Sequence, residues 1–156
     1  MSSEALRVVE RIQDALLLTG DVVADLEDTE ADRRIRRTLM ELAVPDFAVV
    51  MVGPAYLGRT IELSGADGFR EAWTDWTSPF SSYRVDLDDL IDAGDHVVSL
   101  VTMSGKTKTG GVEVNASGGA VWKIVEGRLH RVEFHLDRES ALRAAGLDPQ
   151  SSQPKL

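Results

Sequence analysis

The sequence contains no cysteine. This absence excludes disulfides, thiolate metal sites and thiol catalysis, and it fits a reducing compartment. Basic residues are also scarce, because 17 Lys and Arg stand against 26 Asp and Glu and give a formal net charge of −9. A surface of this sign repels phosphate groups, so we expect neither nucleic acid nor an anionic membrane as a partner.

A targeting signal and a membrane-spanning run are missing as well. The first residues lack a basic stretch followed by an apolar one, and the long uncharged run from Phe47 is interrupted by Gly53, Pro54 and Gly58. We therefore expect a cytoplasmic protein. A length of 156 residues with 43% hydrophobic residues predicts one domain, which we place at 1–147 and follow with a flexible tail at 148–156.

Hydrophobic periodicity changes from helical to strand-like along the chain. The spacing of apolar residues predicts helices over 3–19, 21–28, from Thr29 to the residues before Pro45, 66–77 and 138–145. Alternation and turn residues predict strands over 47–52, 59–63, 82–92, 96–107, 112–117, 119–125 and 128–136. This order indicates an α+β fold in which the N-terminal helices pack on one face of a curved antiparallel sheet.

Four segments, taken in order, resemble the SnoaL-like branch of the nuclear transport factor 2 superfamily. They are SGADGFREAW at 64–73, GDHVV at 94–98, VWKIVEGRL at 121–129 and DRESALRAAGL at 137–147. The resemblance implies a cone with a pocket at its open end, and a homodimer formed across the outer face of the sheet. The segment near residues 25–43 is longer than the family usually has, which predicts extra helix near the pocket mouth.

The resemblance also implies where related enzymes keep their acids and bases. In the ketosteroid isomerases, the position of the catalytic base corresponds to about Met51 of this sequence, that of the hydrogen-bonding acid to about Ala120, and that of a tyrosine to about Gln13. In the limonene epoxide hydrolases, the position of the carboxylate that activates water corresponds to Phe134. Methionine and alanine cannot abstract a proton or stabilise an oxyanion, so the isomerase mechanism is poorly supported. Phe134 likewise supplies no carboxylate to activate water. The implied pocket is apolar and aromatic, and its predicted ligand-binding residues are Gln13, Met51, Trp73, Trp76, Asn115, Trp122 and Phe134. The alternative is that these side chains fill the cone as core.

Two residues are candidates for catalysis. His130 could act as an acid or base if it points inward like Phe134, or it could bond to backbone or water near the turn. Asp46 could lie over the pocket mouth or cap the turn after Pro45. His130 and His135 are five residues apart on one strand and so fall on opposite faces, which argues against a metal site, and His135 is predicted to face outward. We expect no cofactor.

The leading hypothesis is a SnoaL-like protein that binds a small apolar or aromatic molecule and has no clear catalytic constellation. The alternative is an isomerase, cyclase or dehydratase acting on a small lipophilic or polyketide-like substrate, with His130 or Asp46 assisted by Asn115, Tyr56 or Tyr83. A protein-interaction scaffold is the third hypothesis. The family's fold hosts all three, so only the arrangement of the pocket residues can discriminate between them.

Overall fold

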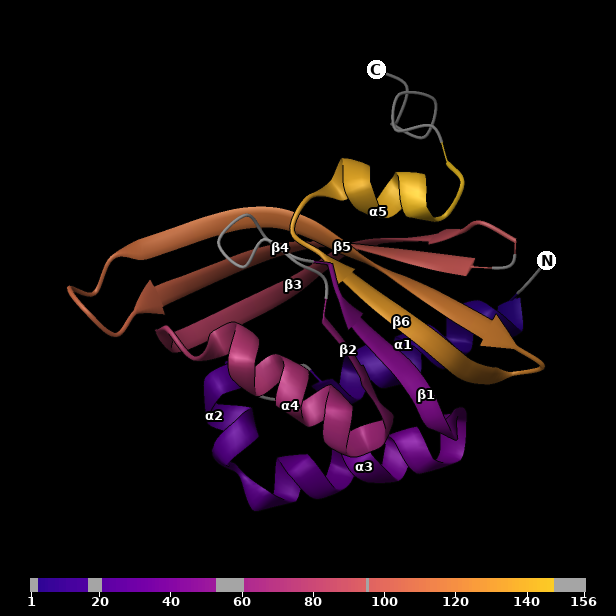
Figure 1. Cartoon of the computed structure of the whole chain (residues 1–156), viewed down its shortest axis with the longest axis horizontal. Helices are drawn as coiled ribbons and strands as arrows, with labels where there is room; N and C mark the ends of the chain where they lie inside the picture. Colours follow the sequence, from indigo (N-terminus) through magenta and orange to yellow (C-terminus); the bar gives the residue numbers. More distant parts are fainter. Residues whose placement is uncertain (1–2, 17–20, 53–60, 95, 148–156) are drawn as a thin grey trace.

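The computed structural model describes residues 3–16, 21–52, 61–94 and 96–147 (Figure 1). The elements are α1 (Ser3–Leu16), α2 (Val22–Glu27), α3 (Thr29–Leu42), β1 (Ala43–Met51), β2 (Ile61–Ser64), α4 (Gly65–Thr77), β3 (Phe80–Asp92), β4 (His96–Thr107), β5 (Glu113–Val125), β6 (Arg128–His135) and α5 (Arg138–Ala144). The expected α+β class is confirmed, with helices first and strands after. The predicted tail at 148–156 lies outside the described residues.

The strands form one six-stranded sheet in the order β2-β1-β6-β5-β4-β3. All neighbouring pairs are antiparallel except β1 and β6, which run parallel with Val49 opposite Val132. The sheet is therefore mixed, and the expected antiparallel pairing is found at the other four pairs. Parallel strands need a long connection, and here most of the domain lies between β1 and β6.

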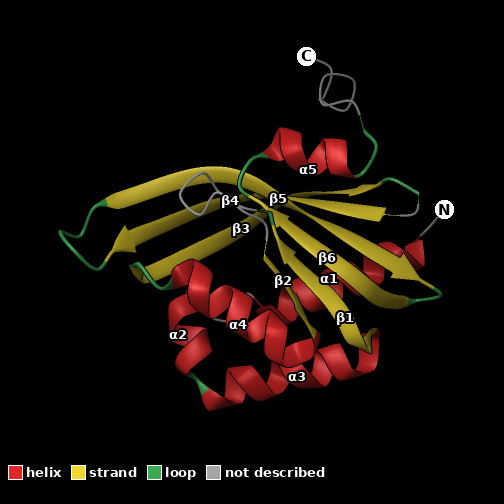
Figure 2. Ribbon diagram, in the orientation of Figure 1, coloured by secondary structure: helices red, strands yellow, loops and turns green. Residues whose placement is uncertain are grey.

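The helices lie on both sides of the curved sheet. Helices α1, α2, α3 and α4 cover its inner face, and α5 lies alone on the outer face (Figures 1 and 2). The main core is between the inner helices and the sheet, and it contains Val9, Ile12, Phe69, Trp122 and Phe134, among others. A second, smaller core of Val98, Val121, Ala141 and Leu142 joins α5 to the outer face.

Aspartate side chains cap three of the helices. Asp137 Oδ1 accepts from Ser140 N at 2.8 Å at the start of α5, as its N-cap position predicts. Asp21 Oδ1 caps α2 through Val23 N and also accepts from Tyr83 N of β3, both at 3.1 Å. The helix that the sequence places at Thr29 is capped by Asp28, which accepts from Glu30 N at 2.9 Å.

Strand β5 runs without a break through Gly118 and Gly119, where the sequence predicts two strands. The glycines are needed there for close packing rather than for a turn. A Cβ added at Gly119 would lie 2.9 Å from the Ala141 Cβ of α5 and 3.0 Å from the Ser99 carbonyl oxygen. Helix α5 can therefore approach the sheet because this position has no side chain.

We predict that Gly119→Ala lowers the free energy of unfolding by about 1–3 kcal/mol, because the new methyl group collides with α5 and with β4. Urea denaturation measures the change. Ser117→Ala, an exposed position two residues earlier on β5, is the matched control and is expected to change stability by less than about 0.5 kcal/mol. Equal effects of the two substitutions would contradict the packing role of Gly119.

Candidate functional site

A cavity of about 40 Å³ lies on the inner face of the sheet, between the strands and α1, α2 and α4. Most of its wall is apolar, and the polar side chains in the wall belong to Gln13, Trp73, Trp76 and Ser99. The full lining is Gln13, Val22, Trp73, Trp76, Val85, Ser99, Val101, Met103, Gly119, Ala120, Phe134 and His135. We call this space the cone cavity. Within the described residues, no carboxylate lines it.

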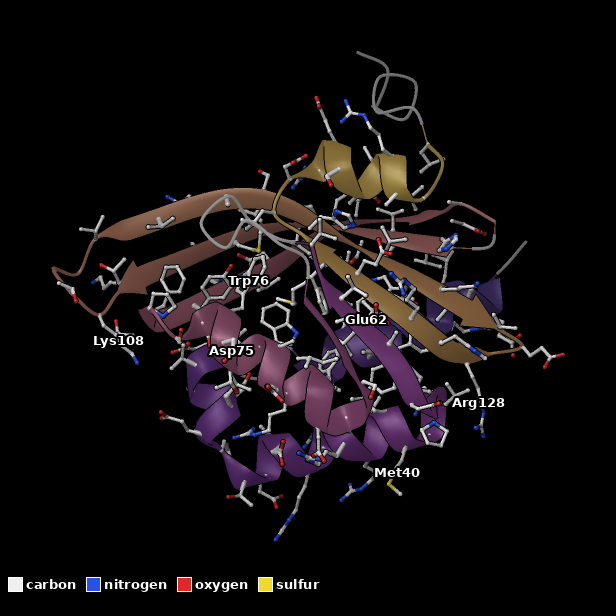
Figure 3. The ribbon with its side chains drawn as sticks, in the orientation of Figure 1. Met40, Glu62, Asp75, Trp76, Lys108 and Arg128 are labelled. Atoms are coloured by element: carbon white, nitrogen blue, oxygen red, sulfur yellow. The ribbon has the colours of Figure 1, made fainter. Side chains whose placement is uncertain are left out.

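Aromatic rings make up one wall of the cone cavity. Trp73 and Trp76 come from α4, and Phe134 comes from the end of β6. The Trp73 ring meets the Phe134 ring edge-on, with centroids 5.1 Å apart, and lies 6.5 Å from the Trp76 ring. Figure 3 shows Trp76 between α4 and the sheet. Helical spacing on α4 therefore does bring both tryptophans to the inner face of the sheet.

Hydrogen bonds fix two of the tryptophan rings. Trp76 Nε1 donates to the Tyr83 hydroxyl at 2.8 Å, and that hydroxyl donates to the Met103 sulfur at 3.1 Å. Trp122 Nε1 donates to Ser99 Oγ at 2.9 Å. Each bond joins groups that are removed from water, so each ring is held in one orientation.

Two of the predicted ligand-binding residues belong to the core behind the cavity. Met51 and Trp122 are buried and join the same core as Phe134. Neither residue is part of the cavity wall. Met51 and Trp122 nevertheless share one apolar interior with Phe134, because Met51 pairs with Phe134 across β1 and β6, and the Trp122 and Phe134 ring centroids are 6.0 Å apart.

The side chains of Asn115, His130 and Asp46 lie elsewhere. All three residues are exposed, and none lines the cone cavity. His130 is the extra residue of a β-bulge, since the pairing steps from Lys123–Arg131 to Ile124–Leu129. The bulge interrupts the alternation of β6, so Leu129 takes the inner face in place of His130. Tyr56, the other polar candidate, lies outside the described residues.

The side chain of His135 points toward α5 on the outer face of the sheet, which agrees with its predicted direction, and α5 buries it there. Its Nδ1 lies 2.7 Å from Ser140 Oγ of α5, and its Nε2 lies 3.2 Å from Glu133 Oε1. A carboxylate can only accept, so in the neutral ring Nε2 donates to Glu133 and Nδ1 accepts from Ser140. Arg131 Nε, 2.9 Å from Glu133 Oε2, holds the carboxylate in place. The sequence did not predict this series of hydrogen bonds, because its periodicity does not show that α5 packs over β6.

A second cavity, also of about 40 Å³, lies among the inner helices. We call it the helix cavity. It lies among α1–α4, so it includes the long segment near residues 25–43. Its lining is Ala15, Val22, Asp25, Leu26, Ala31, Asp32, Ile35, Arg36, Leu39, Ala66, Phe69, Arg70 and Trp73.

Ion pairs form the rim of the helix cavity. Asp32 pairs with Arg36 at 3.0 Å and with Arg70 at 3.2 Å, and Arg36 also pairs with Asp67 at 2.8 Å. The hydrogen bonds to Asp67 and Asp32 raise the pKa of Arg36 above its ordinary value. Positive and negative groups balance here, so the rim offers no unpaired charge from these four residues.

The described residues were also compared with what a metal site and a membrane-spanning helix require. Within the described ranges, no three His, Asp or Glu side chains gather as a metal site would require. No helix in the part of the chain that the structure describes is both long enough and apolar enough to cross a membrane.

Comparison with known proteins identifies the domain. The sequence model of the SnoaL-like domain matches residues 23–132, more than half of the chain. Among curated proteins, no sequence matches this chain.

Solved structures share the fold. A protein from Jannaschia sp. CCS1, provisionally named a SnoaL-like polyketide cyclase, aligns with a TM-score of 0.64 and 16% identity over 99% of this chain and 98% of that one. A protein of ketosteroid isomerase-like fold from Catenulispora acidiphila, solved in complex with trimethylamine, aligns with a TM-score of 0.57 and 16% identity over 94% and 97% of the two chains. TerC, co-crystallised with polyporic acid, aligns with a TM-score of 0.54 and 20% identity over 81% and 92%.

The hydrogen bond between Trp122 and Ser99 supports the wall of the cone cavity. Ser99→Ala leaves the buried indole N–H without its acceptor, and we predict a loss of about 1–3 kcal/mol in the free energy of unfolding. Chemical denaturation of Ser99→Ala, Trp122→Phe and the double variant measures the coupling. Fully additive losses would show that the two residues do not depend on each other.

Proposed function

The chain belongs to the SnoaL-like domain family, and we propose that it binds a small apolar or aromatic molecule inside the cone. One observation carries the proposal: the buried space on the inner face of the sheet is walled by Trp73, Trp76 and Phe134, with few polar side chains among them. Burial of a flat apolar molecule against such a wall contributes roughly 25 cal/mol for each Å² removed from water.

We assign the contacts to the residues of the cavity wall. Trp73, Trp76 and Phe134 would pack against the ligand, and Gln13, which is buried on α1, would donate to or accept from a polar atom of it. Met51 and Trp122 would act from behind this layer by holding Phe134 in place. Asn115 is exposed on β5 and has no part in the proposed site.

Relatives in complexes support the idea of a ligand in this fold. TerC was crystallised with polyporic acid, and the Catenulispora acidiphila protein was solved with trimethylamine. At 16–20% identity these structures share the fold with this chain, and they identify no ligand for it.

The positions of the candidate catalytic residues give less support to the enzyme hypothesis than to the binding hypothesis. An isomerase, cyclase or dehydratase needs a base and a donor that converge on one point of a pocket. His130 and Asp46 are exposed and lie outside the cavity wall. His135 does line the cavity, but its side chain points toward α5 and both of its ring nitrogens are engaged with Ser140 and Glu133. The binding function is therefore the better supported of the two.

A homodimer and a cytoplasmic location remain predictions from the sequence and its resemblance. In a homodimer across the sheet, the partner would have to pack beside α5 on an outer face. We predict that light scattering over a range of protein concentrations gives twice the 17.0 kDa mass of one chain. A mass of one chain at every concentration would contradict the dimer.

Ligand binding can be tested by filling the cone cavity. Ala120 lines the cavity, whereas Ala116 lies four residues earlier on the same strand and does not. We predict that Ala120→Leu weakens binding of apolar aromatic compounds at least about tenfold, because the larger side chain occupies the space. Ala116→Leu is the matched control and should bind normally. Thermal-shift screening followed by calorimetry provides the measurement, and the absence of any binder to the wild-type protein would contradict the proposed function.

A further inference from the structure

We infer that the cone cavity and the helix cavity are two ends of one ligand site, that α2 is its lid, and that Trp73 Nε1 donates to a neutral acceptor oxygen of a flat ligand larger than one aromatic ring. The inference rests on the proposed function. To the proposed function it adds how far the ligand site extends, which helix moves to open it, and which polar group the ligand carries.

The volumes show that neither cavity is sufficient alone. Each measures about 40 Å³. A buried apolar cavity that binds benzene measures roughly 150 Å³. An aromatic ligand therefore needs more space than either cavity offers, and joining the two spaces with one wall moved outward would supply it.

The wall between the cavities is made by two residues. Val22 of α2 and Trp73 of α4 are the residues that line both spaces. Val22 begins a helix of six residues, whereas Trp73 sits in the middle of a helix of 13. Outward movement of α2 would remove Val22 from the partition and leave Trp73 as a wall of the joined site.

The attachments of α2 are those of a lid. A helix this short gains little stability from its own backbone bonds. At its start, Asp21 Oδ1 accepts from Tyr83 N at 3.1 Å, and near its end Arg70 Nη2 donates to the Leu26 carbonyl oxygen at 2.6 Å. Val22 is the one residue of α2 that is fully buried, with Val23 and Leu26 packed against the core at its edge, whereas α4 buries six residues. Segments that bury little apolar surface open at a low free-energy cost compared with the rest of a fold.

Trp73 supplies the polar contact. It is 8% exposed, and among the described residues its buried Nε1 has no hydrogen-bond acceptor, whereas the Nε1 atoms of Trp76 and Trp122 have one. A buried donor without an acceptor is unfavourable, and an oxygen on the ligand would relieve it. The acceptor should be neutral, because Arg36 and Arg70 at the rim of the helix cavity already pair with Asp32.

Two ligands of nearly equal shape test the donor. 2-Acetylnaphthalene and 2-ethylnaphthalene differ in a carbonyl oxygen. Calorimetry on the wild-type protein should show about tenfold tighter binding of the acetyl compound, as one added hydrogen bond implies. Trp73→Phe should abolish this preference. Trp76→Phe changes the same binding wall but removes a donor that is already bonded to Tyr83, so it should weaken both compounds alike and keep the preference.

The outcomes separate the two proposals. Equal binding of both compounds to the wild-type protein, or a preference that Trp73→Phe leaves unchanged, overturns the role of Trp73 and leaves the proposed function standing. If neither compound binds, the proposed function fails for this class of ligand and the inference fails with it. Circular dichroism of each variant verifies that it is folded.

The lid has its own test. Arg70→Gln removes the charged bond to the Leu26 carbonyl oxygen, so α2 should open more often and 2-acetylnaphthalene should associate about tenfold faster in stopped-flow measurements. Arg33→Gln is the control, because Arg33 pairs with Glu30 on the exposed side of α3. An unchanged association rate in Arg70→Gln would show that α2 is not the lid.

Discussion

The packing of α4 against the inner face of the sheet is the contact on which the rest of the structure depends. Phe69, Trp73 and Trp76 repeat at helical spacing and present three large rings to the strands. Phe134 receives two of them, with centroids 6.0 Å from Phe69 and 5.1 Å from Trp73. Edge-on and tilted contacts suit the charge distribution of aromatic rings. Both cavities lie beside these rings, since Trp73 lines each of them.

The polar atoms of the aromatic side chains decide how firmly each ring is held. Trp76 is joined through Tyr83 to Met103, and Trp122 is joined to Ser99. In both cases an α4 or β5 ring is linked to β3 or β4, so the rings and the sheet must move together. The N–H of Trp73 has no such link to the described part of the chain. The ring between the two cavities is thus held by packing alone, while its neighbours are held by packing and by hydrogen bonds.

Much of this fold could be predicted from the sequence, because helical and alternating periodicities report which side of an element is buried. The face of α4 and the Asp137 cap of α5 follow from local spacing. The parallel pairing of β1 with β6 does not, since it joins residues far apart in the chain. The cover that α5 places over His135 was not predicted, and neither was the bulge at His130. One extra residue reverses the face of a side chain, and no single sequence shows where a strand contains it.

The ligand site proposed above has the sheet on one side, the sheet wall, and helices α1–α4 on the other, the helix wall. The two walls differ in the interactions that hold them in place. The sheet wall is tied by a continuous ladder of backbone hydrogen bonds, and every strand that lines the cone cavity has a neighbour on both sides except β3. The helices α1–α4 opposite the sheet are held by apolar packing in the main core and by ion pairs between Asp32, Arg36 and Arg70, whose side chains are 25%, 36% and 38% exposed. Ion pairs with this much access to water contribute little to stability. Among the helices that line the two cavities, α2 buries a single residue, Val22, so a ligand that needs more room than the closed cavities offer would gain it most easily on the side of α2.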